Sequence, residues 1–431
     1  MRRAAAVALL ALLLPAEAAA HATLRGTTPE FGAELERGPR RLLIDLDQMV
    51  AVPSVRVLDE RGRNFARGAE PRDTNVVARV APLPRGAYTV RWRALSADGH
   101  AVGGVFTFGV RVAAPPPTDA FGAQGPSRAE HLVRWLYFLS LALLLGALAF
   151  RLLCLRRIAL PPPVDRRLAL LGAIGVVGVI EVGILAFCLR AEGALQLPFG
   201  DFLYGDLSPI ATGTRLGTAF VAMTLAYALV AALLFLAWLT DRAALLVPAF
   251  ALALAFASGL SLSGHSGVDA GASWKSQLAD WVHLSAASVW LGGLGAMLLA
   301  VWPLAPELRR VAFARFARLA TVLIALVVAA GVYLSVLRLP RVDALWEESY
   351  GRVLLVKLAL VSVALAWGAF HHLVVRPALA HGSDRFVGRV GRSLAGEAIV
   401  GSAVLLAAAV LVDSKPPPQP AGPPQAQAER R

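Results

Sequence analysis

The sequence contains few residues of the kinds that stabilise small secreted domains or bind nucleotides. Only two of its 431 residues are cysteine, Cys154 and Cys188, and both lie in apolar segments. We expect these segments near opposite faces of a membrane, so the chain should have no disulfide framework. It also lacks the G-x-x-x-x-G-K-[ST] pattern of a phosphate-binding loop. The absence of this loop argues against pumping driven by ATP.

Charged residues are also scarce, at 16% of the chain, whereas 57% of the residues are hydrophobic. That apolar fraction is too high for a single soluble globule, and most of the chain must lie in a lipid bilayer. The formal net charge of +13 resembles that of a nucleic-acid-binding protein. The basic residues, however, cluster in short loops between apolar runs, where they orient a membrane protein. We therefore expect no nucleic acid partner.

The first residues indicate export. Residues 1–20 are typical of a secretory signal, with an arginine pair, an apolar run over 4–14 and three alanines at 18–20. Cleavage there would make His21 the first residue of the mature chain. Its amine and imidazole would then give two nitrogen ligands from one residue, a chelate that suits Cu(II). The alternative is that the signal is cut elsewhere or is kept, with His21 an ordinary solvated residue at the start of the first strand.

Residues 21–112 form the only sizeable soluble stretch, and apolar and polar residues alternate along it. We expect strands that include 43–46, 55–58, 88–93 and 105–110, with turns at Arg61-Gly62 and Pro84-Arg85-Gly86. Several short strands in about 90 residues favour a small β-sandwich. A Pro-rich linker at 113–127 follows.

The rest of the chain predicts an all-α membrane domain over 128–413. The loops expected inside carry most of the arginines, so the soluble domain and the C-terminus should both lie outside a bacterial plasma membrane. The last residues, 414–431, lack apolar periodicity and predict a disordered tail. Eight apolar segments are each long enough to cross a bilayer, near 133–153, 168–189, 216–239, 243–262, 279–302, 313–336, 353–375 and 394–413.

A metal site is indicated in the soluble domain. Asp98 and His100 lie two residues apart between the last two expected strands, so their side chains can face the same way. Together with His21 they would form a tetragonal nitrogen and oxygen set, which favours Cu(II). The alternative is that Asp98 is a turn residue and His100 a solvated side chain.

These residues carry a family resemblance. The stretch from His21-Ala22-x-Leu24 to Thr28-Pro29, followed by Gly86-x-Tyr88-x-Val90-x-Trp92 and Ser96-x-Asp98-x-His100, resembles CopC, a periplasmic copper-binding β-sandwich. The resemblance implies a Greek-key sandwich of the immunoglobulin or cupredoxin type. It also implies that His21, Asp98 and His100 are the Cu(II) ligands. Some CopC proteins also have a methionine-rich Cu(I) segment. This soluble domain contains only Met49, so we expect no separate Cu(I) site in it.

The membrane half resembles CopD, the membrane partner often fused to CopC, over about 127–413. The resemblance rests on Ser263-Gly264-His265, on the run from Asp280 and His283 through Trp290 to Gly292-Gly293, and on Tyr350-Gly351-Arg352-x-Leu354-Leu355-x-Lys357. In addition, Gly292, Gly293 and Gly295 would allow helices to pack closely.

Polar groups inside the membrane half need a reason to be there, because the bilayer penalises them. We expect His131, His265, Asp280 and His283 near the outer face, where they would form a site that receives copper, including Cu(I), from the soluble domain. Glu181 and Lys357 lie deeper and would form a polar relay. Their alternative roles are solvated interfacial histidines, a snorkelling lysine and a hydrogen-bonded carboxyl group.

Together these features predict a copper-handling membrane protein rather than an enzyme. It would bind Cu(II) outside and pass copper to or across the membrane, exchanging it with periplasmic donor or acceptor proteins. One rival is a haem-containing redox protein, which requires two axial histidines on facing helices. A second rival is a copper-binding buffer that the bundle merely anchors.

Overall fold

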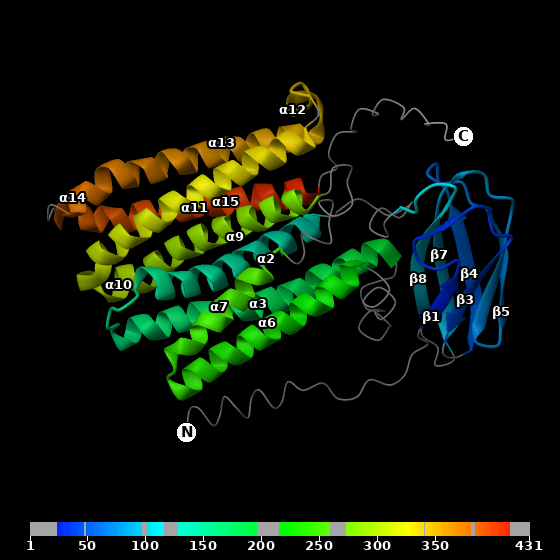
Figure 1. The fold of residues 1–431 in the computed structure, drawn as a ribbon, viewed down its shortest axis with the longest axis horizontal. Coiled ribbons are helices and arrows are strands. Elements are labelled where there is room, and N and C mark those ends of the chain that lie inside the picture. The colour runs from blue at the N-terminus through cyan, green and yellow to red at the C-terminus, as the bar shows by residue number, and fades with distance from the viewer. Residues whose placement is uncertain are drawn as a thin grey trace, which may run out of the picture. The chain divides into compact units, whose positions relative to one another are not determined.

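The structure is a computed structural model that describes residues 24–46, 49–96, 101–115, 128–195, 215–258, 273–339, 341–380 and 384–413. The expected signal peptide, most of the expected linker and the tail lie outside these residues. A β part is followed by a helical part (Figure 1). The chain forms two compact units, one containing the β part and the segment 184–223, the other 131–183 and 224–431.

The β part is a sandwich of two four-stranded sheets, as the sequence predicts. One sheet has the order β1-β3-β6-β5 and the other β2-β8-β7-β4. Neighbouring strands are antiparallel, except that β2 runs parallel to β8. The strands are β1 (Leu24–Thr28), β2 (Ala33–Leu35), β3 (Arg41–Leu46), β4 (Val50–Leu58), β5 (Ala66–Arg72), β6 (Asn75–Val80), β7 (Gly86–Ser96) and β8 (Ala101–Val110).

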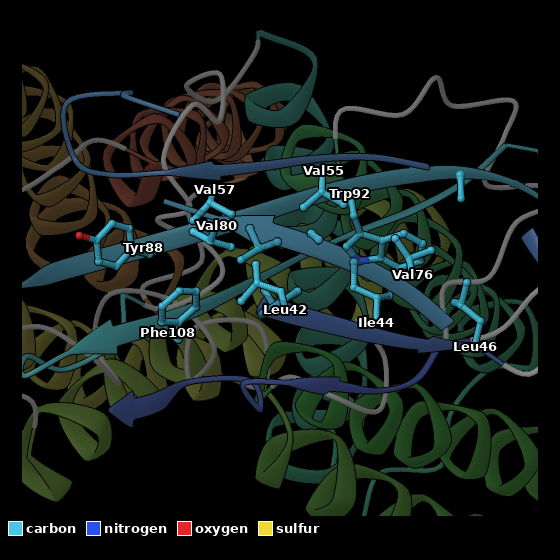
Figure 2. Packing of buried hydrophobic residues seen from close by; sticks show 14 of the residues in the cluster. Leu42, Ile44, Leu46, Val55, Val57, Val76, Val80, Tyr88, Trp92 and Phe108 are labelled. Carbon is cyan, nitrogen blue, oxygen red and sulfur yellow. The ribbon is translucent and has the colours of Figure 1, made fainter. Parts of the chain in front are cut away.

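Alternation along the strands builds the sandwich core. Leu42, Ile44 and Leu46 on β3 are fully buried, because every second side chain of a strand faces the same way. They pack against residues of the opposite sheet such as Trp92 and Phe108 (Figure 2). Burial of each such side chain stabilises the fold by roughly 1.5–3 kcal/mol. The soluble part therefore has a core of its own.

A carboxylate organises the turn between β4 and β5. The Asp59 Oδ1 atom accepts hydrogen bonds from the backbone amides of Arg61 and Arg63, at 3.0 and 2.8 Å. Its Oδ2 atom accepts from Arg63 Nε at 2.7 Å. Gly62 has a φ of 74°, which a residue without Cβ adopts at little cost. The turn expected at Arg61-Gly62 is confirmed.

The largest core side chain requires a glycine on the neighbouring strand. Trp92 on β7 pairs with Gly104 on β8, and the indole of Trp92 lies against the glycine backbone. A Cβ atom at Gly104 would lie 2.5 Å from Trp92 Nε1, well inside van der Waals contact. This position can therefore hold only glycine unless Trp92 moves.

The helical part includes seven helices long and apolar enough to cross a membrane, among the described residues. Many apolar side chains stay exposed on them, among them Leu225, Val336 and Leu373, as expected of surfaces that face lipid. The principal helices are α2 (Arg128–Ala149), α3 (Pro162–Leu195), α6 (Arg215–Thr240), α7 (Leu246–Ala255), α9 (Trp274–Ala296), α11 (Arg309–Arg338), α13 (Ser349–Phe370) and α15 (Asp384–Asp413), joined by the short α10 (Trp302–Leu304), α12 (Ala344–Glu347) and α14 (Arg376–Ala380).

The crossing expected near 243–262 differs from the other seven. Here the structure has a short 3₁₀ turn, Ala243–Leu245, and the ten-residue α7. The expected segment continues beyond Ser258, outside the described residues. An eighth crossing therefore stays a prediction.

Two glycines let α2 and α9 touch backbone to backbone. A Cβ atom at Gly292 would lie 1.7 Å from the carbonyl oxygen of Ala142, and one at Gly146 would lie 2.1 Å from the Gly292 carbonyl carbon. Gly293 lies similarly close to the ring of Phe316, whereas Gly295 faces open space. Close packing is thus confirmed for Gly292 and Gly293 but not for Gly295. Small residues are what such helix contacts need.

Within the described ranges, three of the long helices continue directly into a π-helical turn. These turns are Phe150–Cys154 after α2, Met297–Val301 after α9 and His371–Val375 after α13. Directly after the second, Trp302 lies under the Arg309 guanidinium and against Gly391 of α15. Such turns widen a helix by one residue and often occur at functional sites.

Candidate metal site and membrane polar clusters

The expected copper ligands of the soluble domain flank two strand ends. His21 lies three residues before β1, and Asp98 and His100 lie between β7 and β8. All three are outside the described residues, so this ligand set stays a prediction. The strands on either side of them are described, and they determine where the two segments leave the sandwich.

The strand register brings these two strand ends to the same end of the sandwich. Leu24, the first residue of β1, pairs with Leu46, the last residue of β3. The chain then crosses to the other sheet within four residues, and Val50 at the start of β4 pairs with Ser96 at the end of β7. The β7–β8 hairpin follows directly. The start of β1 and the last described residue of β7 therefore lie at the same end of the sandwich, on different sheets.

A thioether lies in the crossing between β3 and β4. Met49 is 66% exposed, although methionine usually packs in an apolar core. Among the described residues of the sandwich it is the only methionine. A second soft ligand would have to come from elsewhere.

In the membrane half, Asp280 and His283 both face α11. The Asp280 carboxylate binds Arg338 Nη2, with its two oxygens at 3.2 and 3.0 Å. His283 Nδ1 lies 2.9 Å from the carbonyl oxygen of Val327, and Gly331 leaves room beside the ring. Asp280 and His283 are three residues apart and share one face of α9, as the sequence predicts. The arginine partner of Asp280 was not predicted.

Lys357 belongs to this cluster. It lies on α13, close enough to Arg338, Asp280 and His283 to interact with each of them electrostatically. Glu181, its expected relay partner, is exposed on α3. Among the described ion pairs none joins Glu181 to Lys357, so the structure does not bring this predicted pair together. The cluster of Asp280, Arg338 and Lys357 carries more positive than negative charge.

The remaining predicted residues lie apart or outside the description. His131 lies in the first turn of α2 and is half-buried. His265 is outside the described residues. Among the residues that the structure describes, no three His, Cys, Asp or Glu side chains gather closely enough to hold a metal ion. A copper site of His131, His265, Asp280 and His283 stays a prediction.

A second polar cluster joins α13 to α15. His371 Nδ1 lies 2.7 Å from Glu397 Oε2, and both side chains are buried. His371 Nε2 lies 2.8 Å from Ser393 Oγ. Trp367 Nε1 donates to the same oxygen at 2.9 Å. The four residues form one connected hydrogen-bond network.

Sequence reasoning missed the carboxylate of this cluster. Glu397 lies in the last apolar segment, where an ionisable residue is costly and is therefore a signal in itself. Ser393 precedes it by one helical turn, on the same face. What the sequence does not specify is which helix packs opposite, and that decides which partner Glu397 meets.

Three family comparisons match successive parts of the chain. Residues 24–111 match the sequence model of the CopC domain. Residues 128–276 match the N-terminal domain of copper resistance protein D-like proteins. Residues 310–411 match copper resistance protein D, or CopD.

Two curated proteins are similar in sequence. Copper transport protein CutJ of Bacillus subtilis (strain 168) is 27% identical over 439 residues, which cover 96% of this chain and 77% of CutJ. Copper resistance protein C of Escherichia coli is 46% identical over 46 residues, covering 11% of this chain and 36% of that protein.

Two solved structures are similar to the soluble part. The crystal structure of CopC from Methylosinus trichosporium OB3b is 26% identical and covers 21% of this chain and 93% of its own, with a TM-score of 0.20. The crystal structure of PcoC, a methionine-rich copper resistance protein from Escherichia coli, is 26% identical, covers 21% of this chain and 99% of its own, and has a TM-score of 0.19.

Proposed function

Because this chain is a CopC domain joined to a CopD membrane domain, and so a multi-pass membrane protein of the copper resistance and transport class, we propose that it captures Cu(II) outside the membrane and passes copper to or across the bilayer. Copper is its cargo, and no reaction on another substrate is required. The soluble domain would bind the ion and the helical domain would carry it onward.

The capture site consists of His21, Asp98 and His100. The observation that supports it is the register of the sandwich, since the start of β1 and the β7–β8 hairpin leave the same end of the fold. A terminal amine, two imidazoles and a carboxylate form the nitrogen-rich set that Cu(II) prefers.

The test is Cu(II) titration of the full-length protein in detergent, with a native His21 start and, in parallel, with one extra alanine before it. Copper EPR reports the ligands. The proposal expects tight binding with nitrogen coupling for the native start and a large loss of affinity for the extended form. Equal binding by both forms would rule out the terminal chelate.

Onward transfer would start at the outer face of the helical domain, through His131, His265 and His283. Asp280 is already bound by Arg338, so it would contribute only after that ion pair opens. Cellular copper uptake and tolerance test this step. His283→Ala should impair both, as should His100→Ala. If His283→Ala behaved like wild type while His100→Ala did not, the helical domain would be an anchor for a copper buffer.

The haem rival has less support from the described histidines. It needs two imidazoles free to bind iron from facing helices. Both ring nitrogens of His371 already have partners, and so does one nitrogen of His283. An absorption spectrum of the purified protein should therefore show no Soret band.

A further inference from the structure

The His371–Glu397 pair has no role in copper capture or entry as proposed above, yet it lies buried between helices. His371 and Glu397 are 6% and 4% exposed. Two ionisable groups in such a place are costly unless they are paired and hydrogen-bonded, and each is. A purely structural contact between α13 and α15 could be made by apolar residues at no such cost.

The hydrogen bonds around His371 fit both of its protonation states. The Trp367 indole can only donate, so it makes Ser393 Oγ an acceptor and leaves the hydroxyl hydrogen free to turn. When His371 is neutral, Nδ1–H donates to Glu397 and the Ser393 hydroxyl donates to Nε2. When His371 is protonated, Nε2–H donates to Ser393 Oγ, which accepts from His371 and Trp367 together. Neither state leaves a ring nitrogen without a partner.

A small cavity that is large enough to hold water adjoins this network. It has a volume of about 50 Å³ and is lined by His371, His372 and Glu397 together with side chains of α9 and α11 such as Trp290, Phe313 and Thr321. That is room for at least one water molecule, which needs roughly 10–15 Å³. The lining from α9 and α11 is uncharged, so among the residues that the structure describes, His371, His372 and Glu397 are the titratable groups that face the cavity.

The helix is widened at this point. His371 begins the π-helical turn His371–Val375, which lies between α13 and α14. Its ring also meets Phe313 of α11 edge-on, at 5.9 Å between centroids. A π-turn aims a side chain differently from a regular helix and often occurs at a functional position. Here it coincides with the first residue of the buried pair.

We propose that His371, Glu397, Ser393 and Trp367 form a proton-exchange site that couples copper movement through the membrane domain to the opposite movement of a proton. The inference rests on the proposed function. It supplies a coupled ion, which is one of the two driving forces, beside a copper gradient, that we expect for a chain without a phosphate-binding loop. On uptake, Nε2 binds a proton released by a hydronium ion in the cavity, and the Ser393 hydroxyl hydrogen turns away. On release, Nε2 returns the proton to water.

Charge explains the direction of coupling. With a carboxylate at Glu397, the pair has a net charge of −1 when His371 is neutral. With protonated His371 the net charge is zero. In a medium of low dielectric constant this difference acts strongly on another cation in the same domain. The deprotonated site therefore favours bound copper, and protonation favours its release.

The experiment uses full-length protein in liposomes that contain a pH-sensitive dye, with copper added outside. Copper entry and internal pH are followed together. In the wild type, proton exit should accompany copper entry. Glu397→Gln keeps a hydrogen-bond acceptor for Nδ1 but removes the charge that stabilises the imidazolium, so it should abolish proton exit. His371→Gln should do the same. His372→Gln, which alters the same cavity outside the network, should behave like the wild type.

A second measurement examines the site without transport. ¹⁵N-histidine NMR of the full-length protein should show His371 Nε2 gaining a proton as the pH is lowered. The change should be lost in Glu397→Gln. The signal is assigned from its loss in His371→Gln, and size-exclusion profiles check that each variant is folded.

The outcomes separate the two proposals. Copper entry without proton exit in the wild type, or proton exit that persists in Glu397→Gln, overturns the coupling while the proposed function stands. Absence of copper entry in the wild type removes the proposed function. In that event a His371 signal that does not change with pH overturns the exchange site as well, and one that changes supports it.

Discussion

At the scale of single residues, the contact between Trp92 and Gly104 limits what the sandwich tolerates. In Gly104→Ala the new methyl group would overlap the buried indole, so Trp92 must move within a packed core. Overpacking of this kind costs about 1–3 kcal/mol. Hydrogen exchange of β7 and β8 in the full-length protein should therefore accelerate. Gly26→Ala, which meets nothing within 4 Å, is the matched control and should have little effect.

The ion pair of Asp280 and Arg338 leads to a second prediction about single residues. If Asp280 serves mainly to hold Arg338, then Asp280→Asn and Arg338→Gln remove the same interaction. Thermal unfolding should show that the double variant loses less stability than the sum of the two single losses, by about 0.5–3 kcal/mol. Additive losses, with copper uptake abolished by Asp280→Asn alone, would instead make Asp280 a copper ligand.

At the scale of elements, the turn on Asp59 makes the sandwich sensitive to acid. Burial alone would raise the pKa of Asp59, but the hydrogen bonds and charge of Arg63 outweigh it and lower that pKa. A lowered pKa in the folded state contributes stability that is complete above the unfolded value of about 3.9 and is lost as pH falls through the folded value.

Hydrogen exchange of β4 and β5 should therefore accelerate as pH falls below about 4, once the intrinsic pH dependence of exchange is subtracted. In Asp59→Asn this part of the acceleration should be smaller, because asparagine does not titrate. At neutral pH the same variant should be less stable by about 1 kcal/mol, since a charged acceptor is lost from a surface turn. An unchanged acid profile in the variant would show that Asp59 is not responsible.

The elements themselves were largely predictable, and their partners were not. Alternation identified the strands that contain Leu43, Val55, Tyr88 and Val105, because one face of each must be apolar. Apolar length identified the seven long helices for a similar reason. The ion pair of Asp280 with Arg338 and the network around Glu397 depend on which helices pack together. Neither periodicity nor length contains that information.

At the scale of the whole molecule, the number of crossings decides which side holds the C-terminus. Eight crossings return the tail to the side of the soluble domain, whereas seven leave it on the opposite side. We expect eight. In intact cells, Ser414→Cys should react with a thiol reagent that does not cross membranes, and Arg156→Cys, between α2 and α3, should react only after lysis. The reverse result for Ser414→Cys would mean that the short α7 does not cross.

The π-turn Met297–Val301 implies a length constraint on the chain. Such a turn holds one residue more than a regular helix needs and absorbs it in its wider ring, so removing one residue from it would restore the α-helix and leave Trp302 facing Arg309 and Gly391. Removing a residue from the regular part of α9 would instead rotate everything beyond it by about 100° and turn Trp302 away. The helix therefore tolerates a one-residue deletion within the π-turn and not before it.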